Sequence, residues 1–99
     1  MATLRAEEDH LEDVEDFLAR RKGLKHLRAR RRADSIIIES GSSGAVSSHA
    51  RLRRVSVHRW TLDMPNHLGR WEPTPYEAAL ETLLTQLIRD FPWALAPVS

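Results

Sequence analysis

Basic side chains are the residues whose spacing most clearly suggests chemistry in this sequence. Eight lysines and arginines and no acid fall between residues 20 and 32, and Leu27 and Ala29 alternate there with arginines. Alternate side chains of a strand point to the same face of a sheet. We therefore predict an arginine stripe on one face, extended by two residues of another strand: Arg28, Arg30, Arg32, Arg51 and Arg53. Such a stripe suits the phosphates of a nucleic acid or a partner surface.

The same run also has a plainer interpretation. Seven acids and one base lie in residues 1–19, whereas the basic run follows directly, and the whole chain carries a net charge of +1. The bases would then offset the acidic first segment and keep an uncovered sheet face soluble. Both interpretations stay open at the level of sequence.

Carboxylates are the second set of candidate residues. Glu39, Asp63 and Glu72 lie on or near predicted neighbouring strands. Converging carboxylates can hold magnesium for phosphodiester chemistry, although strand ends commonly carry such charges for solubility. A metal-dependent nuclease is therefore the least favoured of the alternatives that we keep.

Histidines and serines give no catalytic pattern. The five histidines have no clustered ligand spacing, and no cysteine is present to supply a thiolate, so we predict surface histidines and no metal site. Ser56, His58 and Asp63 contain the residue types of a hydrolase triad but lack a G-x-S-x-G turn. We predict no catalytic residue and no cofactor.

Composition indicates one folded α+β domain spanning residues 1–99. The chain is 41% hydrophobic and 29% charged, as in ordinary globular proteins. Its uncharged apolar runs, such as Ile36 to Ile38, are far shorter than the roughly 20 residues that span a bilayer. The first residues lack the basic start and apolar stretch of a secretion signal. We expect a cytoplasmic protein without membrane contact.

An amphipathic helix is predicted near each end of the chain. The first runs from about residue 4 to 22 and ends before Gly23, on an apolar stripe formed by Leu4, Leu11, Val14 and Leu18. The second runs from about residue 75 to 91, because Thr74 to Glu77 forms a capping box with proline at the first helical position. Pro92 ends it, and Trp93 is expected to fold back onto the core.

Strands are predicted within residues 24–72, as an antiparallel meander of three to five strands. The β-branched triplet Ile36 to Ile38 is the clearest strand. Residues 41–48 are rich in glycine and serine and predict a flexible loop. The register between residues 50 and 63 is left open, and Trp60 and Trp71 are assigned to the core.

Several segments resemble one uncharacterised family. Ala50 to Leu52, Trp60 to Leu62, Gly69 to Pro73 and Leu80 to Asp90 are similar in type and spacing to the bacterial domain-of-unknown-function family 3024. The resemblance implies two tryptophans paired across a hairpin, then an amphipathic helix and a closing aromatic cluster. The chain lacks that family's tyrosines after the tryptophan segments and its closing cysteine-containing motif. These features are structural and imply no catalysis.

The sequence therefore predicts a small non-enzymatic interaction or accessory module, whose partner is another protein or a second copy of the chain. The alternative is a nucleic-acid-binding protein that uses the arginine stripe. The two differ in their expected response to salt, because binding to phosphates weakens steeply as salt rises and an interaction module shows no such dependence.

Overall fold

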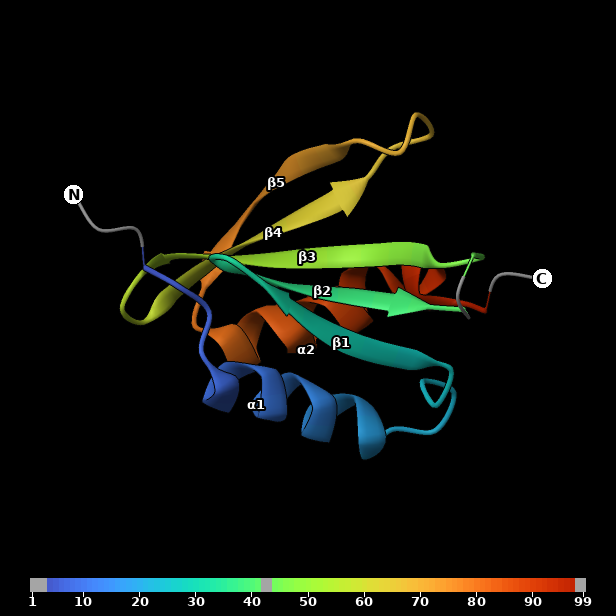
Figure 1. Ribbon diagram of the computed structural model, residues 1–99, viewed down its shortest axis with the longest axis horizontal. Helices are drawn as coiled ribbons and strands as arrows, with labels where there is room; N and C mark the ends of the chain where they lie inside the picture. Colours follow the sequence, from blue (N-terminus) through green and yellow to red (C-terminus); the bar gives the residue numbers. More distant parts are fainter. Residues whose placement is uncertain (1–3, 42–43, 98–99) are drawn as a thin grey trace.

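The computed structural model describes residues 4–41 and 44–97. Five antiparallel strands form one sheet, with one helix before and one helix after the strands in the chain (Figure 1), which confirms the predicted α+β class. The elements in chain order are α1 (Glu8–Ala19), β1 (Leu27–Arg32), β2 (Ser35–Ser40), β3 (Ser47–Ser56), β4 (Arg59–Pro65), β5 (Trp71–Ala78), α2 (Leu80–Asp90) and the 3₁₀ turn η1 (Pro92–Leu95).

The strands follow one another across the sheet in sequence order. A two-residue turn joins β1 to β2, and its first residue, Ala33, has a φ of 52°. Positive φ at this position matches the right-handed twist of hairpin strands. The pairing of β1 with β2 is regular from Leu27 opposite Ser40 to Arg32 opposite Ser35. That regularity fixes which β1 side chains share a face.

Both helices cover the same face of the sheet. In Figure 1, α2 lies behind the strands and α1 lies along β1. Aliphatic side chains and one tryptophan form the core between the helices and the sheet. Its fully buried residues are Val14, Ile36, Ile38, Leu52, Trp60, Leu62, Leu83, Leu84 and Leu87. Among the described residues, no helix lies on the opposite face of the sheet. None of the helices in the described part of the chain has the length and apolarity needed to cross a membrane.

The first helix is shorter than predicted at both ends. It begins at Glu8 rather than near Leu4, because the preceding segment is extended and Ala6 N–H donates to the Ala33 carbonyl at 2.9 Å. His10 Nδ1 accepts from the Glu7 N–H at 2.9 Å and fixes the first turn. The helix ends at Ala19, and Gly23 follows at a φ of 85°.

The predicted start of the second helix is wrong. Residues 74–77 belong to β5, which pairs with β4, and α2 begins only at Leu80. Thr74 Oγ1 donates to the Leu62 carbonyl at 2.8 Å instead of capping a helix. β5 is an edge strand, where prolines such as Pro73 and Pro75 are tolerated because one side of the backbone has no strand neighbour. The strands therefore extend beyond residue 72.

The structure also differs from the predictions for one loop and two tryptophans. Ser47 and Ser48 open β3, so the expected loop of residues 41–48 is shorter, and its residues 42–43 lie outside the described residues. Trp71 is only half-buried and lies on the open face rather than in the core. Trp93 is 69% exposed, so it does not cover the core, although its ring contacts Phe91.

Candidate nucleic-acid interface

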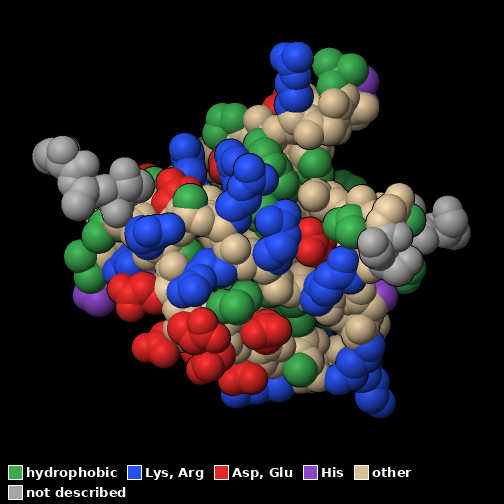
Figure 2. Space-filling view, viewed as in Figure 1, with side chains coloured by type: hydrophobic (Ala, Val, Ile, Leu, Met, Phe, Trp, Pro, Cys, Tyr) green, Lys and Arg blue, Asp and Glu red, His purple; other side chains and the backbone are tan. Residues whose placement is uncertain are grey.

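The helix-free face of the sheet carries all five arginines of the predicted stripe. Arg28, Arg30 and Arg32 alternate along β1, opposite Glu39, Ile37 and Ser35. Arg51 and Arg53 lie on β3, opposite Ile37 and Ser35 on the other side of β2. We call these five residues the arginine face. Figure 2 shows basic side chains gathered over the strands on this side of the molecule.

The arginine stems explain how β2 is buried on a face without a helix. Ile37 points to this face and is nonetheless buried, with Arg30 and Arg51 as its cross-strand neighbours. Long arginine stems cover apolar surface while their guanidinium groups stay in water. The triplet Ile36 to Ile38 is thus buried on both sides, by the helices and by the arginines.

Glu39 lies buried beneath the β1 arginines. The distance from its Oε1 to Arg30 Nε is 3.3 Å, and the distance to Arg28 Nε is 3.5 Å. Arg28 also donates to the Gly41 carbonyl. The carboxylate therefore holds two guanidinium groups close to the sheet and offsets part of their charge.

Asp63 plays the same part beneath the β3 arginines. Its Oδ2 accepts from Arg51 Nη2 at 2.8 Å and from Arg51 Nε at 2.9 Å, and it lies 3.9 Å from Arg53 Nε. The Arg51 guanidinium is also 5.0 Å from the centre of the Trp71 ring. A carboxylate and an aromatic ring thus fix Arg51, which leaves its plane preorganised on the surface.

Charge is segregated between the two sides of β1. The five arginines lie over two buried carboxylates, Glu39 and Asp63, whereas acidic side chains gather over α1 at the lower margin of Figure 2. Arg31, which alternates out of the arginine face, reaches Glu8 of α1 at 3.7 Å. The acids of α1 therefore adjoin the arginine face at the β1 edge and do not lie across it.

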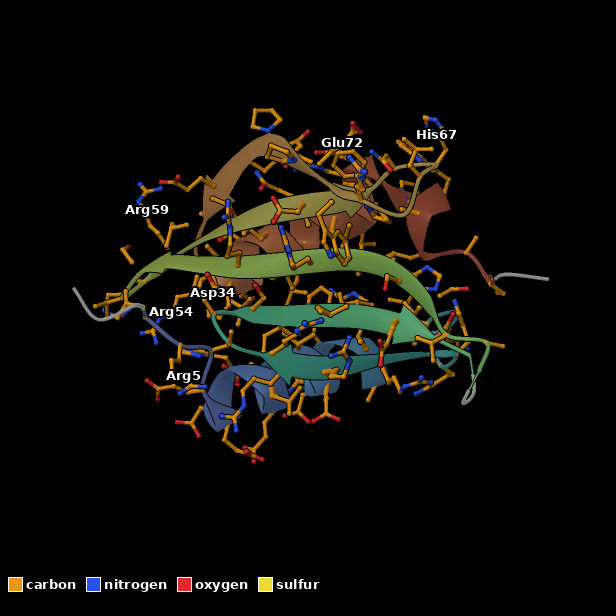
Figure 3. All side chains as sticks on the ribbon, turned by 45° about the horizontal axis from the view of Figure 1, so that its top comes forward. Arg5, Asp34, Arg54, Arg59, His67 and Glu72 are labelled. Carbon is orange, nitrogen blue, oxygen red and sulfur yellow. The ribbon has the colours of Figure 1, made fainter. Side chains whose placement is uncertain are left out.

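Arg54 has a different role from its neighbours on β3. Its guanidinium donates to the carbonyls of Arg5 and Val57, each at 2.9 Å, and its backbone N–H donates to the Asp34 carbonyl at 2.8 Å. Figure 3 shows Arg54 beside Asp34 and Arg5 at one end of the sheet. This arginine ties the N-terminal segment to two hairpins.

The three carboxylates considered for a nuclease do not converge. Glu39 and Asp63 lie on β2 and β4, with β3 between them, and each is paired with arginines. Glu72 lies on β5 opposite Met64, and Figure 3 shows it toward the same end of the sheet as His67. Within residues 4–41 and 44–97, no group of three histidine or acidic side chains is placed to hold a metal ion.

The residues of the possible triad are also apart. Ser56 and His58 lie at the turn between β3 and β4, while Asp63 lies farther along β4 beneath Arg51. The sequence composition supplied these residue types without bringing them together.

One buried pair of polar side chains, His49 and Ser40, was not predicted from the sequence. His49, predicted on the surface, is buried: its Nδ1 donates to the Ala94 carbonyl at 2.7 Å, and its Nε2 is 2.7 Å from Ser40 Oγ. Since a carbonyl only accepts, Nδ1 carries a proton, and Nε2 shares the second hydrogen bond with the serine hydroxyl. A β-bulge between Ile38 and Glu39 makes His49 the extra residue of β3, which turns it toward the helices. No local sequence pattern marks this bulge.

Comparison with known proteins gives no relative, since no family model, curated protein or solved structure matches this chain. The resemblance to family 3024 accordingly stays a prediction. The arginine face is therefore the main feature of this protein that bears on its function.

Proposed function

We propose that this chain is a small nucleic-acid-binding module whose arginine face contacts the phosphate backbone. The observation that carries the proposal is the placement of five arginines on the one sheet face without helices, over two buried carboxylates. Guanidinium groups match phosphates in charge and in planar, bidentate geometry. The four arginines that contact these carboxylates lose less side-chain entropy on binding, because they are already held in place.

The edges of the sheet favour binding through the arginine face over the binding of a partner strand at an edge. Strand addition needs unpaired backbone N–H groups along an edge strand. β5 contains Pro73 and Pro75, which have no N–H to donate, and α1 packs against β1 at the other edge. The prolines at one edge and the helix beside the other make strand addition the less favoured mode of binding.

Protein interaction is a second candidate, and one observation favours it. Trp93 is 69% exposed and packs against Phe91, which itself contacts Tyr76. Exposed tryptophan is typical of the centres of interfaces. This aromatic cluster is formed by the end of α2, η1 and β5, so the two candidates are separable by mutation.

The test is the salt dependence of binding to a labelled single-stranded oligonucleotide. Counterion release predicts that log K falls linearly with log salt, with a slope of about 0.7 for each phosphate neutralised on a single strand. The variant Arg28→Gln/Arg30→Gln/Arg32→Gln should bind weakly and reduce the slope by about 2. Fluorescence anisotropy at several salt concentrations measures both quantities.

Two matched variants complete the experiment. Arg20→Gln/Arg21→Gln/Lys22→Gln removes the same charge near the end of α1, where these side chains line pockets beside α2, and should leave most of the binding intact. Replacing the three β1 arginines by lysine keeps the charge and should keep most of the slope. Equal losses from the two glutamine variants would refute a specific arginine face, and loss in a Trp93→Ala variant alone would favour the second candidate.

A further inference from the structure

A cluster of polar side chains occupies the middle of the arginine face, between β3 and β4. Thr61 and Asp63 are two residues apart on β4, and their cross-strand partners on β3 are Arg53 and Arg51. Residues two apart on a strand share a face, so all four side chains point to the same side of the sheet. Arg30 and Arg32 lie on the same face two strands away.

Three buried atoms of this cluster have no hydrogen-bond partner among the described residues. They are Arg53 Nε, Thr61 Oγ1 and Asp63 Oδ1. Asp63 is only 1% exposed, and Arg51 occupies its other oxygen, Oδ2. Unpartnered polar atoms at buried positions are rare in native proteins because each forfeits its bonds to water. Three on neighbouring residues indicate a site that a ligand completes.

The chemistry of these atoms excludes phosphate as their sole ligand. Arg53 Nε donates, Thr61 Oγ1 donates or accepts, and Asp63 Oδ1 only accepts. An ionised phosphate offers acceptors alone, so it would satisfy Arg53 and be repelled by the carboxylate. The edge of a nucleobase offers N–H donors beside acceptors, and carboxylates accept from the cytosine N4 amino group.

A planar surface lies beside the cluster. The guanidinium of Arg51 bonds to Asp63 and lies 5.0 Å from the centre of the Trp71 ring. Bases of single strands stack on arginine planes and aromatic rings, and only an unpaired base can present its edge as well. The Arg51 and Arg53 side chains are 26% and 42% exposed, so both are open to solvent beside the cluster.

We propose that Arg53, Thr61 and Asp63 form a subsite for the edge of one unpaired nucleobase, which stacks beside Arg51 while its amino group donates to Asp63 Oδ1. This inference rests on the proposed function, because the surrounding arginines hold the backbone of the same strand. With this subsite, the arginine face would recognise a base as well as the charge of the phosphates.

The test compares two strands of equal length and charge, a deoxycytidine oligomer and an abasic oligomer. In Asp63→Asn, the donors of Arg51 hold the amide oxygen in the place of Oδ2, so the amide N–H₂ takes the place of Oδ1 and faces the base amino group. Affinity for the deoxycytidine oligomer should fall by about fivefold or more. Affinity for the abasic oligomer should rise, because the face loses a negative charge.

Thr61→Val is the companion variant, since valine keeps the branched shape and removes only the hydroxyl. It should weaken binding of the deoxycytidine oligomer and leave the abasic oligomer unchanged, and it decides the matter if Asp63→Asn fails to fold by circular dichroism. A parallel response of both oligomers to Asp63→Asn, together with no effect of Thr61→Val, would overturn the subsite and leave phosphate binding in place. Absence of salt-dependent binding of wild-type protein to either strand would instead overturn the proposed function.

Discussion

Asp63 and Glu39 show how single residues prepare a charged surface. Each carboxylate is buried on the arginine face and contacts two guanidinium groups. Removing a buried carboxylate would leave the arginines free to repel one another, whereas removing the arginines would leave a buried charge unpaired. The two carboxylates thus hold the arginines in place, and they also offset part of the positive potential of the arginines.

Tyr76 and Asp90 form a second pair whose titration can be measured directly. Tyr76 donates from its hydroxyl to Asp90 Oδ2 at 3.1 Å, and this hydrogen bond raises the pKa of Tyr76 above its ordinary value. A hydrogen bond from Arg89 is the main reason that the pKa of Asp90 is lowered. The stability from Asp90 is present above its unfolded pKa and is lost as pH falls through its folded pKa. The stability from Tyr76 is present below its unfolded pKa and is lost as pH rises through its folded pKa.

Tyr76 is the single tyrosine of the chain, so phenolate absorbance during an alkaline titration reports it alone. We expect a midpoint above the ordinary value of about 10, returning toward that value in Asp90→Asn. A wild-type midpoint at the ordinary value, unmoved by the substitution, would contradict the hydrogen bond.

At this scale the alternation in the sequence was enough to place Arg28, Arg30 and Arg32 on one face of their strand, and the pairing of β2 with β3 adds Arg51 and Arg53 to it. The alternation was not enough to place Thr61 and Asp63 opposite Arg53 and Arg51, because that pairing depends on the register of β3 with β4, which alternation leaves open. Trp71 was assigned to the core because large aromatics usually fill small cores, yet here its ring lies under a guanidinium.

Among the elements, α2 contributes most of the helical side of the core. Leu84 is 2% exposed and lies among the buried leucines of this helix. Leu84→Ala should lower the free energy of unfolding by about 2–5 kcal/mol through lost burial and a residual cavity. Chemical denaturation measures the change. Leu68→Ala is the control, since Leu68 is 68% exposed and its loss should change stability by no more than about 0.5 kcal/mol. Equal effects would contradict the assigned core.

The apolar stripe of α2 was predictable, but its first residue was not. Thr74 to Glu77 fits a helix cap locally, yet the same residues complete the hydrogen bonds of β4 as an edge strand. Sheet pairing outweighed the local signal because β4 would otherwise present an unpaired edge next to the buried Leu62. Tertiary pairing of this kind is invisible in a single segment.

For the whole molecule, the arrangement separates the hydrophobic core from the arginine face. The helices and the aliphatic core occupy one side of the sheet, and the arginines occupy the other. The acidic side chains of α1 border the arginine face along β1 only (Figure 2). They therefore limit the positive surface on that side and leave the rest of it uncovered. A strand of nucleic acid is therefore expected to run across β1 to β4.

Mapping the bound surface tests this central claim most directly. Two-dimensional NMR spectra of the protein, titrated with a single-stranded deoxycytidine oligomer, report each backbone amide, the arginine Nε–H groups and the tryptophan indoles separately. The account predicts the largest shifts at Arg28, Arg51 and Trp71, with Leu84 and Trp93 little changed. Shifts confined to Trp93 and Leu68, with the arginine face unchanged, would contradict it.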